Sequence, residues 1–149
     1  MNRNLSDDYG FHPFDTNNCK IRLRNEYDKH KKLVVGFDFD NTIFDCHNNG
    51  GNYSQVIELL KRCKALGFIL CLYTAEARDE RLKWKIEYCK HFGIDPDYTN
   101  NSPLLGGKTD KPFFNILLDD RAGLESAFYT LLDVVNYAEG IRLNQSEQQ

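Results

Sequence analysis

Two apolar runs that each end in a pair of aspartates constrain the fold of this chain more than any other feature of the sequence. Continuous apolar runs of this kind predict strands that are buried on both faces, as in a parallel sheet. Placing carboxylates at the ends of buried strands is costly unless a positive charge meets them. The pattern therefore predicts a cation site at the carboxyl edge of the sheet, where open parallel sheets bind their ligands. The runs are residues 33–37 and 113–118, followed by Asp38 and Asp40 and by Asp119 and Asp120.

Helical and strand patterns alternate along the rest of the chain, which is typical of a parallel α/β fold. Ser54 opens a predicted helix that ends before Gly67, and this glycine is placed to cap the helix in a left-handed conformation. A strand, a helix and a second strand in this order form a right-handed parallel crossover. The sequence thus predicts a single α/β, Rossmann-like three-layer domain with a central, mostly parallel sheet. The predicted helices are residues 54–66, 77–92 and 124–137, and the predicted strands are residues 33–37, 68–73, 98–99 and 113–118.

The length of 149 residues suits one domain with one hydrophobic core. Residues 1–32 show no clean periodicity and predict an N-terminal extension packed on or beside the core, with Ile21 and Leu23 in a short edge strand. Residues 33–143 are the predicted core domain. Residues 144–149 are polar and predict a frayed tail.

Composition excludes several classes of protein. No apolar run approaches the roughly 20 residues that span a bilayer, and the amino terminus lacks the basic and apolar segments of a signal peptide, which favours a cytoplasmic protein. The five cysteines include no Cys-x-x-Cys pair, which predicts reduced thiols and argues against a zinc site. A net charge of −3 provides no overall attraction to nucleic acid.

The two aspartates after the first predicted strand suit joint action on one ligand. Residues two apart on a strand point to the same side, so Asp38 and Asp40 can approach a ligand together. Asp119 or Asp120, from a neighbouring strand, brings a third carboxylate, and repulsion among the three makes a bound hard cation close to obligatory. A set of ligands that contains only oxygen favours Mg²⁺.

The order and context of these residues resemble the four motifs of phosphatases in the haloacid dehalogenase superfamily. Residues 38–42, Asp-Phe-Asp-Asn-Thr, resemble the first motif, Asp-x-Asp-x-Thr, and Thr74 at the end of the second predicted strand resembles the second. Lys111 resembles the third motif, and the paired aspartates after the last predicted strand resemble the fourth. The resemblance implies that the core domain is a haloacid dehalogenase-like catalytic domain.

The resemblance further implies a magnesium-dependent phosphomonoester hydrolase that forms an aspartyl-phosphate on Asp38. Asp40 is then the acid that protonates the leaving group and the base that activates the hydrolytic water, and its main-chain carbonyl helps to hold magnesium. A lysine neutralises the phosphoryl oxygens in the transition state. The implied metal set is Asp38, Asp40, Asp119 and Asp120, and the implied substrate-binding set is Thr42, Thr74, Ala75, Lys108 and Arg121.

Three positions allow two interpretations each. Lys111, eight residues before the last acidic pair, is favoured as the catalytic lysine, and Lys108 in a glycine-rich loop is the alternative. Glu76 stands where many relatives have a substrate-binding arginine, and Arg78 is a candidate replacement. Arg121 resembles the Asp-Asp-Arg of nucleotidases and polynucleotide phosphatases, although an ion pair with the neighbouring carboxylates also explains it.

No cap domain fits into this chain, because one helix and short connections separate the motifs. The resemblance is therefore to small capless members. Their open site suits a large phosphorylated substrate, a nucleotide or nucleic-acid end, or a small molecule covered by an oligomeric partner. A nucleotidase or polynucleotide-end phosphatase is the alternative enzyme. A non-catalytic module that holds a metal or a partner in the same acidic crevice is the alternative from another class.

Overall fold

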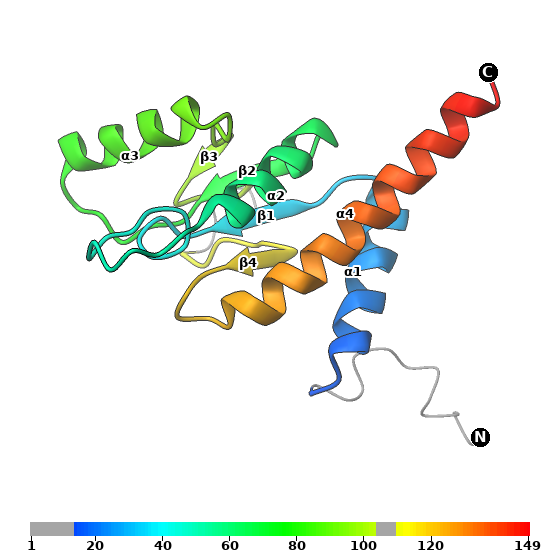
Figure 1. Ribbon diagram of the computed structural model, residues 1–149, viewed down its shortest axis with the longest axis horizontal. Coiled ribbons are helices and arrows are strands. Elements are labelled where there is room, and N and C mark those ends of the chain that lie inside the picture. The colour runs from blue at the N-terminus through cyan, green and yellow to red at the C-terminus, as the bar shows by residue number, and fades with distance from the viewer. Residues whose placement is uncertain (1–13, 104–109) are drawn as a thin grey trace.

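The computed structural model describes residues 14–103 and 110–149, which form a parallel sheet flanked by helices (Figure 1). The four strands lie in the order β3-β2-β1-β4, and every neighbouring pair is parallel. The predicted α/β fold with a central parallel sheet is confirmed. The strands are β1 (Val34–Phe37), β2 (Ile69–Leu72), β3 (Tyr98–Thr99) and β4 (Ile116–Leu118).

Three helices follow strands, as expected of a parallel α/β domain. α2 (Ser54–Ala65) follows β1, α3 (Asp79–His91) follows β2, and α4 (Leu124–Glu147) follows β4. All four residues of β1 are buried, and α2 contributes a buried apolar face to the same hydrophobic cluster. The core therefore lies between the sheet and its helices, and the strand ends stay at its edge.

Two glycines serve a helix end and a close packing contact. Gly67 has a φ of +79° just after α2, which confirms the expected left-handed cap. Gly36, in the middle of β1, lies against the ring of Phe114, and a Cβ here would be only 2.6 Å from that ring. Glycine at position 36 therefore lets the segment before β4 pack directly on β1.

The predicted edge strand at Ile21 and Leu23 is wrong, because this segment is helical (α1, Thr16–His30). Asp15 caps the helix by accepting a hydrogen bond from a backbone N–H of the first turn. Leu23 and Tyr27, one helical turn apart, are buried in the core. α1 lies beside α4 (Figure 1), and a buried stripe this narrow leaves little periodicity in the sequence.

The last helix extends beyond its predicted end at residue 137, and the tail predicted to be frayed is helical as far as Glu147. Arg142 in the added turns donates hydrogen bonds to the carbonyl oxygens of Ala65 and Leu66 at the end of α2. These bonds satisfy carbonyl groups that the end of α2 leaves unpaired. The contact with α2 explains why a polar sequence continues the helix.

The connections between the first three strands are short. From β1 to β2 the chain forms a loop and α2, and from β2 to β3 it forms α3 and its flanking turns. Within residues 14–103 and 110–149 no cap domain is inserted. None of the helices in these ranges combines the length and the apolar character needed to cross a bilayer.

Candidate active site

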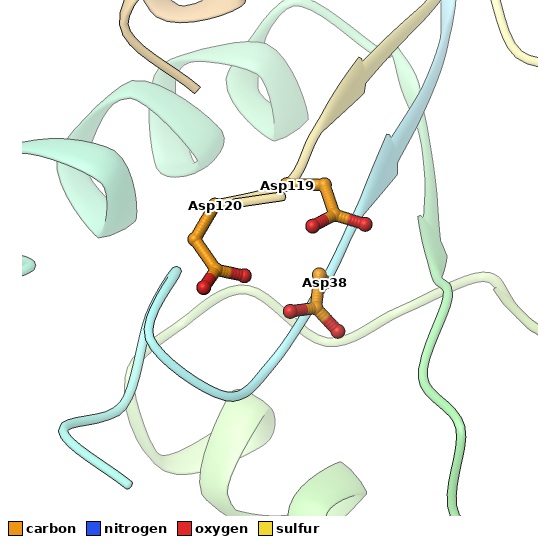
Figure 2. A group of neighbouring side chains, drawn as sticks. All are labelled: Asp38, Asp119 and Asp120. Atoms are coloured by element: carbon orange, nitrogen blue, oxygen red, sulfur yellow. The ribbon is translucent and has the colours of Figure 1, made fainter. Parts of the chain in front are cut away.

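The strand register brings three of the predicted metal ligands together at the carboxyl edge of the sheet. Phe37 of β1 is the register partner of Leu118 of β4, and the N–H of Asp38 donates a hydrogen bond of 2.8 Å to the Leu118 carbonyl oxygen. An aspartate therefore follows each strand at the same level. Asp38, Asp119 and Asp120, here called the acidic cluster, each place one carboxylate oxygen within 4.8 Å of the others (Figure 2).

A tight turn after β1 places Thr42 behind the acidic cluster. The N–H of Thr42 donates to the carbonyl oxygen of Phe39 at 3.3 Å, and Asn41 takes a φ of +55°. Thr42 is completely buried, and its hydroxyl oxygen lies 3.5 Å from Asp38 Oδ2 and accepts a hydrogen bond of 3.1 Å from the Asp120 N–H. Thr42 thus ties the end of β1 to the end of β4, and its contact with a phosphoryl oxygen stays a prediction.

The surroundings of Asp38 disfavour its negative charge. Burial raises the pKa of Asp38 to about 6, and the charges of Asp119, Asp120 and Asp40 act in the same direction, against a hydrogen bond from the Phe39 backbone. A cation in the acidic cluster would relieve this penalty. Three carboxylates with no nitrogen or sulfur donor in the group fit a hard ion such as Mg²⁺.

Lys85 is a buried lysine that none of the sequence motifs includes. It lies beside Asp40 and Thr74. Lys85 of α3 is 2 % exposed, and its Nζ donates hydrogen bonds to Asp40 Oδ2 at 2.8 Å and to Thr74 Oγ1 at 2.9 Å. The same ammonium lies 5.1 Å from the centre of the Phe39 ring. A buried ammonium without a partner is strongly destabilising. The Lys85 ammonium therefore depends on its hydrogen bonds to Asp40 and Thr74. These three residues are called the Lys85 network.

The sequence contains a signal for Lys85. Leu82, Ile86 and Cys89 mark the apolar face of the helix predicted over residues 77–92, and position 85 falls on that face. A lysine is almost never fully buried unless it is paired. Its place on a buried helical face therefore indicates a carboxylate within reach, which the structure identifies as Asp40.

A cavity of about 500 Å³ opens at this edge of the sheet, and its wall includes the acidic cluster and Asp40. Thr74, Ala75 and Arg121 of the predicted substrate-binding set also line it. Lys111 is exposed and is not among the described residues of the wall. Lys108, the alternative lysine, lies outside the described residues.

An ordered loop forms another part of the cavity wall. The carboxylate of Asp45 accepts hydrogen bonds from the three consecutive N–H groups of residues 49–51, at 2.8 to 3.0 Å. These bonds hold the pKa of Asp45 below its ordinary value. Cys46 and His47 from this loop line the cavity, so Asp45 fixes the backbone that presents them.

Comparison with known proteins supports the fold alone. No protein-family model and no curated protein matches the chain. Among solved structures, the chain is similar to a conserved protein from Bacteroides thetaiotaomicron, with a TM-score of 0.52 and 24 % sequence identity. The similarity covers 60 % of this chain and 77 % of the other.

Proposed function

We propose that the chain is a magnesium-dependent phosphomonoester hydrolase of the haloacid dehalogenase type. The observation that carries the proposal is the meeting of Asp38 with Asp119 and Asp120 at the ends of two parallel strands. These carboxylates line the same cavity as Asp40. The arrangement supplies a nucleophile, an acid and base beside it, and ligands for a cation that offsets the charge of a phosphate.

In this proposal Asp38 attacks phosphorus and forms an aspartyl-phosphate, while the leaving oxygen departs in line and takes a proton from Asp40. Asp40 enters this step protonated, having taken up a proton from solvent when the substrate binds. Water then attacks the aspartyl-phosphate, Asp40 takes its proton, and inorganic phosphate leaves. With a pKa of about 6, Asp38 is mostly ionised at neutral pH, as a nucleophile must be. The acidic cluster and the Asp40 carbonyl would hold Mg²⁺, which when bound supplies neutralising charge at the phosphoryl oxygens.

The test is hydrolysis of p-nitrophenyl phosphate with and without Mg²⁺. The wild type is expected to release phosphate, and Asp38→Asn is expected to lower kcat by roughly 10³-fold or more, because it removes the nucleophile. Asp95→Asn, which changes an exposed aspartate elsewhere, is the matched control. Activity that survives Asp38→Asn contradicts the assignment of the nucleophile.

A nucleotidase or polynucleotide-end phosphatase is the second candidate, and Arg121 favours it. Arg121 is exposed in the cavity wall, and the ion pairs of the described residues do not include it. Its guanidinium is thus placed to bind a second anionic group of the substrate. Rates on nucleoside monophosphates, 3′-phosphorylated oligonucleotides and sugar phosphates separate the candidates, and Arg121→Gln should lower kcat/KM selectively for the nucleic-acid ends.

A non-catalytic module with the same fold is the remaining alternative. It uses the acidic cluster to hold a cation without turning over a phosphate. Magnesium binding by the wild type, together with no hydrolysis of any substrate in the panel, would favour this alternative over the enzyme.

A further inference from the structure

We propose that Lys85 is a positioning residue that fixes Asp40 and Thr74 for phosphoryl transfer without touching the substrate itself. The inference rests on the phosphatase function proposed above. It gives a role to a lysine that lies outside all four sequence motifs.

The contacts of Lys85 join the ends of two strands. Its Nζ donates to Asp40 Oδ2 at 2.8 Å and to Thr74 Oγ1 at 2.9 Å. Asp40 lies beyond the end of β1, and Thr74 lies beyond the end of β2, the neighbouring strand. One ammonium therefore holds side chains from both strand ends through two short hydrogen bonds, of which the bond to the carboxylate is charge-assisted.

Burial places Lys85 behind the wall of the cavity. Its side chain is 3 % exposed, whereas the side chain of Asp40 is 37 % exposed. Asp40 and Thr74 both line the cavity, and Lys85 is not among the described residues that do. A phosphate in the cavity meets Asp40 and Thr74, so Lys85 acts on it through them.

Asp40 needs this support because its backbone lies outside the regular sheet. Beyond β1 it pairs only through an isolated bridge to Phe44, and the next residue, Asn41, has a φ of +55°. A carboxylate that exchanges a proton with the leaving oxygen must stay aligned with it. Lys85 binds Oδ2 of Asp40 and so fixes the direction in which this carboxylate faces the cavity.

α3, the helix that carries Lys85, packs through aromatic rings against the turn that contains Asp40. The rings of Trp84 and Tyr88 in α3 lie 5.5 and 5.2 Å from the ring of Phe39. The same two rings lie 5.3 and 5.4 Å from the ring of Phe44. Phe39 and Phe44 begin and end the turn that contains Asp40, so these contacts fix α3 against it. A group that positions another must stand on a rigid element of this kind.

The test compares an alkyl phosphate with p-nitrophenyl phosphate as substrates in the presence of Mg²⁺. Lys85→Met should lower kcat for the alkyl phosphate by roughly 100-fold and change KM by less than about threefold, because alignment is lost and phosphate contact is kept. The loss should be smaller for p-nitrophenyl phosphate, whose leaving group departs without a proton. Lys85→Gln keeps an N–H donor and should give an intermediate kcat. Lys83→Met, which changes an exposed lysine of the same helix, should match the wild type.

A second background shows whether Lys85 acts through Asp40. When Asp40→Asn is already present, adding Lys85→Met should lower kcat by less than about threefold, because the two residues act as a unit. Cooperative urea unfolding establishes that each variant is folded. Should Lys85→Met not fold, Lys85→Gln carries the comparison in both backgrounds.

Three results overturn the inference. They are an unchanged kcat in Lys85→Met, an equal fall of kcat in both backgrounds, and a loss confined to KM, since the last two indicate direct contact with the phosphate. A wild type that hydrolyses no substrate in the panel overturns the proposed function instead, and the inference with it. An active wild type confines any failure to Lys85.

Discussion

Asp38 and Asp40 are residues of one type, two positions apart, with opposite surroundings. Asp38 lies in the acidic cluster, within 4.8 Å of oxygens from two further carboxylates. Asp40 instead lies 2.8 Å from the buried ammonium of Lys85. Burial and the neighbouring carboxylates raise the pKa of Asp38, whereas the chain itself supplies the positive charge that Asp40 needs.

This difference shows that two aspartates after the same strand can serve different roles. The acidic cluster has a surplus of negative charge, which a bound cation would balance. The Lys85 network balances its charge internally and can hold Asp40 in place before any ligand arrives. The acidic cluster should therefore respond to Mg²⁺ and to pH, and the Lys85 network should respond to substitution of either partner.

The largest expected effect on stability comes from Asp40→Asn. This change leaves the Lys85 ammonium buried without an opposite charge, which should destabilise the fold by about 2 kcal/mol, less than for a fully buried pair because Asp40 is partly exposed. Urea unfolding at pH 7.5 measures the loss. Asp95→Asn, at an exposed position, should change the free energy of unfolding by less than about 0.5 kcal/mol.

The double variant Asp40→Asn/Lys85→Met is the control for this prediction. Methionine removes the unpaired ammonium and fits the apolar face of α3, so the double variant should be more stable than Asp40→Asn alone. If the two variants are equally stable, the ammonium of Lys85 is not the source of the loss.

The two sides of the site also differ in how far the sequence predicts them. The acidic cluster follows from the sequence, because Asp38 and Asp119 come directly after strands that a parallel sheet must place at one edge. The contact of Lys85 with Asp40 spans 45 residues and depends on how α3 lies over the turn after β1. Local periodicity does not specify that placement.

The same reasoning explains the errors in the fold. β1, α2, β2 and α3 have continuous or periodic apolar patterns, and their observed bounds lie within about two residues of those predicted. α1 buries Leu23 and Tyr27, which is too little apolar surface to reveal a helical period. The end of α4 is polar and depends on the hydrogen bonds of Arg142 to α2, a tertiary contact that propensity cannot show.

Magnesium should stabilise the folded protein through the acidic cluster and not through the Lys85 network. At a free Mg²⁺ concentration of ten times Kd, the free energy of unfolding should rise by about 1.4 kcal/mol, or roughly 3 to 6 °C in Tm. Lys85→Met should retain this shift. Asp119→Asn and Asp120→Asn should each lose part of the magnesium-dependent shift. The variant that loses more of the shift identifies the residue that contributes more to magnesium binding. A shift of equal size in the wild type and in all the acidic-cluster variants would place the ion elsewhere.

Asp38→Asn should have the smallest effect on the free energy of unfolding. In metal-free buffer it should stabilise the fold, whereas Asp40→Asn should destabilise it. The pKa of Asp38 is about 6 in the folded protein against an ordinary value of 3.8, so the folded state holds the proton more tightly than the unfolded state. Ionisation of Asp38 therefore costs folded stability as the pH rises from about 4 to about 6, and the whole cost is present above that range.

Asparagine removes this cost. Because Asp38 is only half-buried, the advantage of the variant in free energy of unfolding should grow by about 1 kcal/mol as the pH rises from 4 to 7.5. Urea unfolding of both proteins in EDTA across this range gives this difference, because titrating groups far from Asp38 contribute equally to both. A difference that does not change with pH would mean that neither burial nor the neighbouring carboxylates raise the pKa of Asp38 in the folded protein. Added Mg²⁺ should reverse the order of the two proteins, because the wild type then gains a ligand that the variant binds less well.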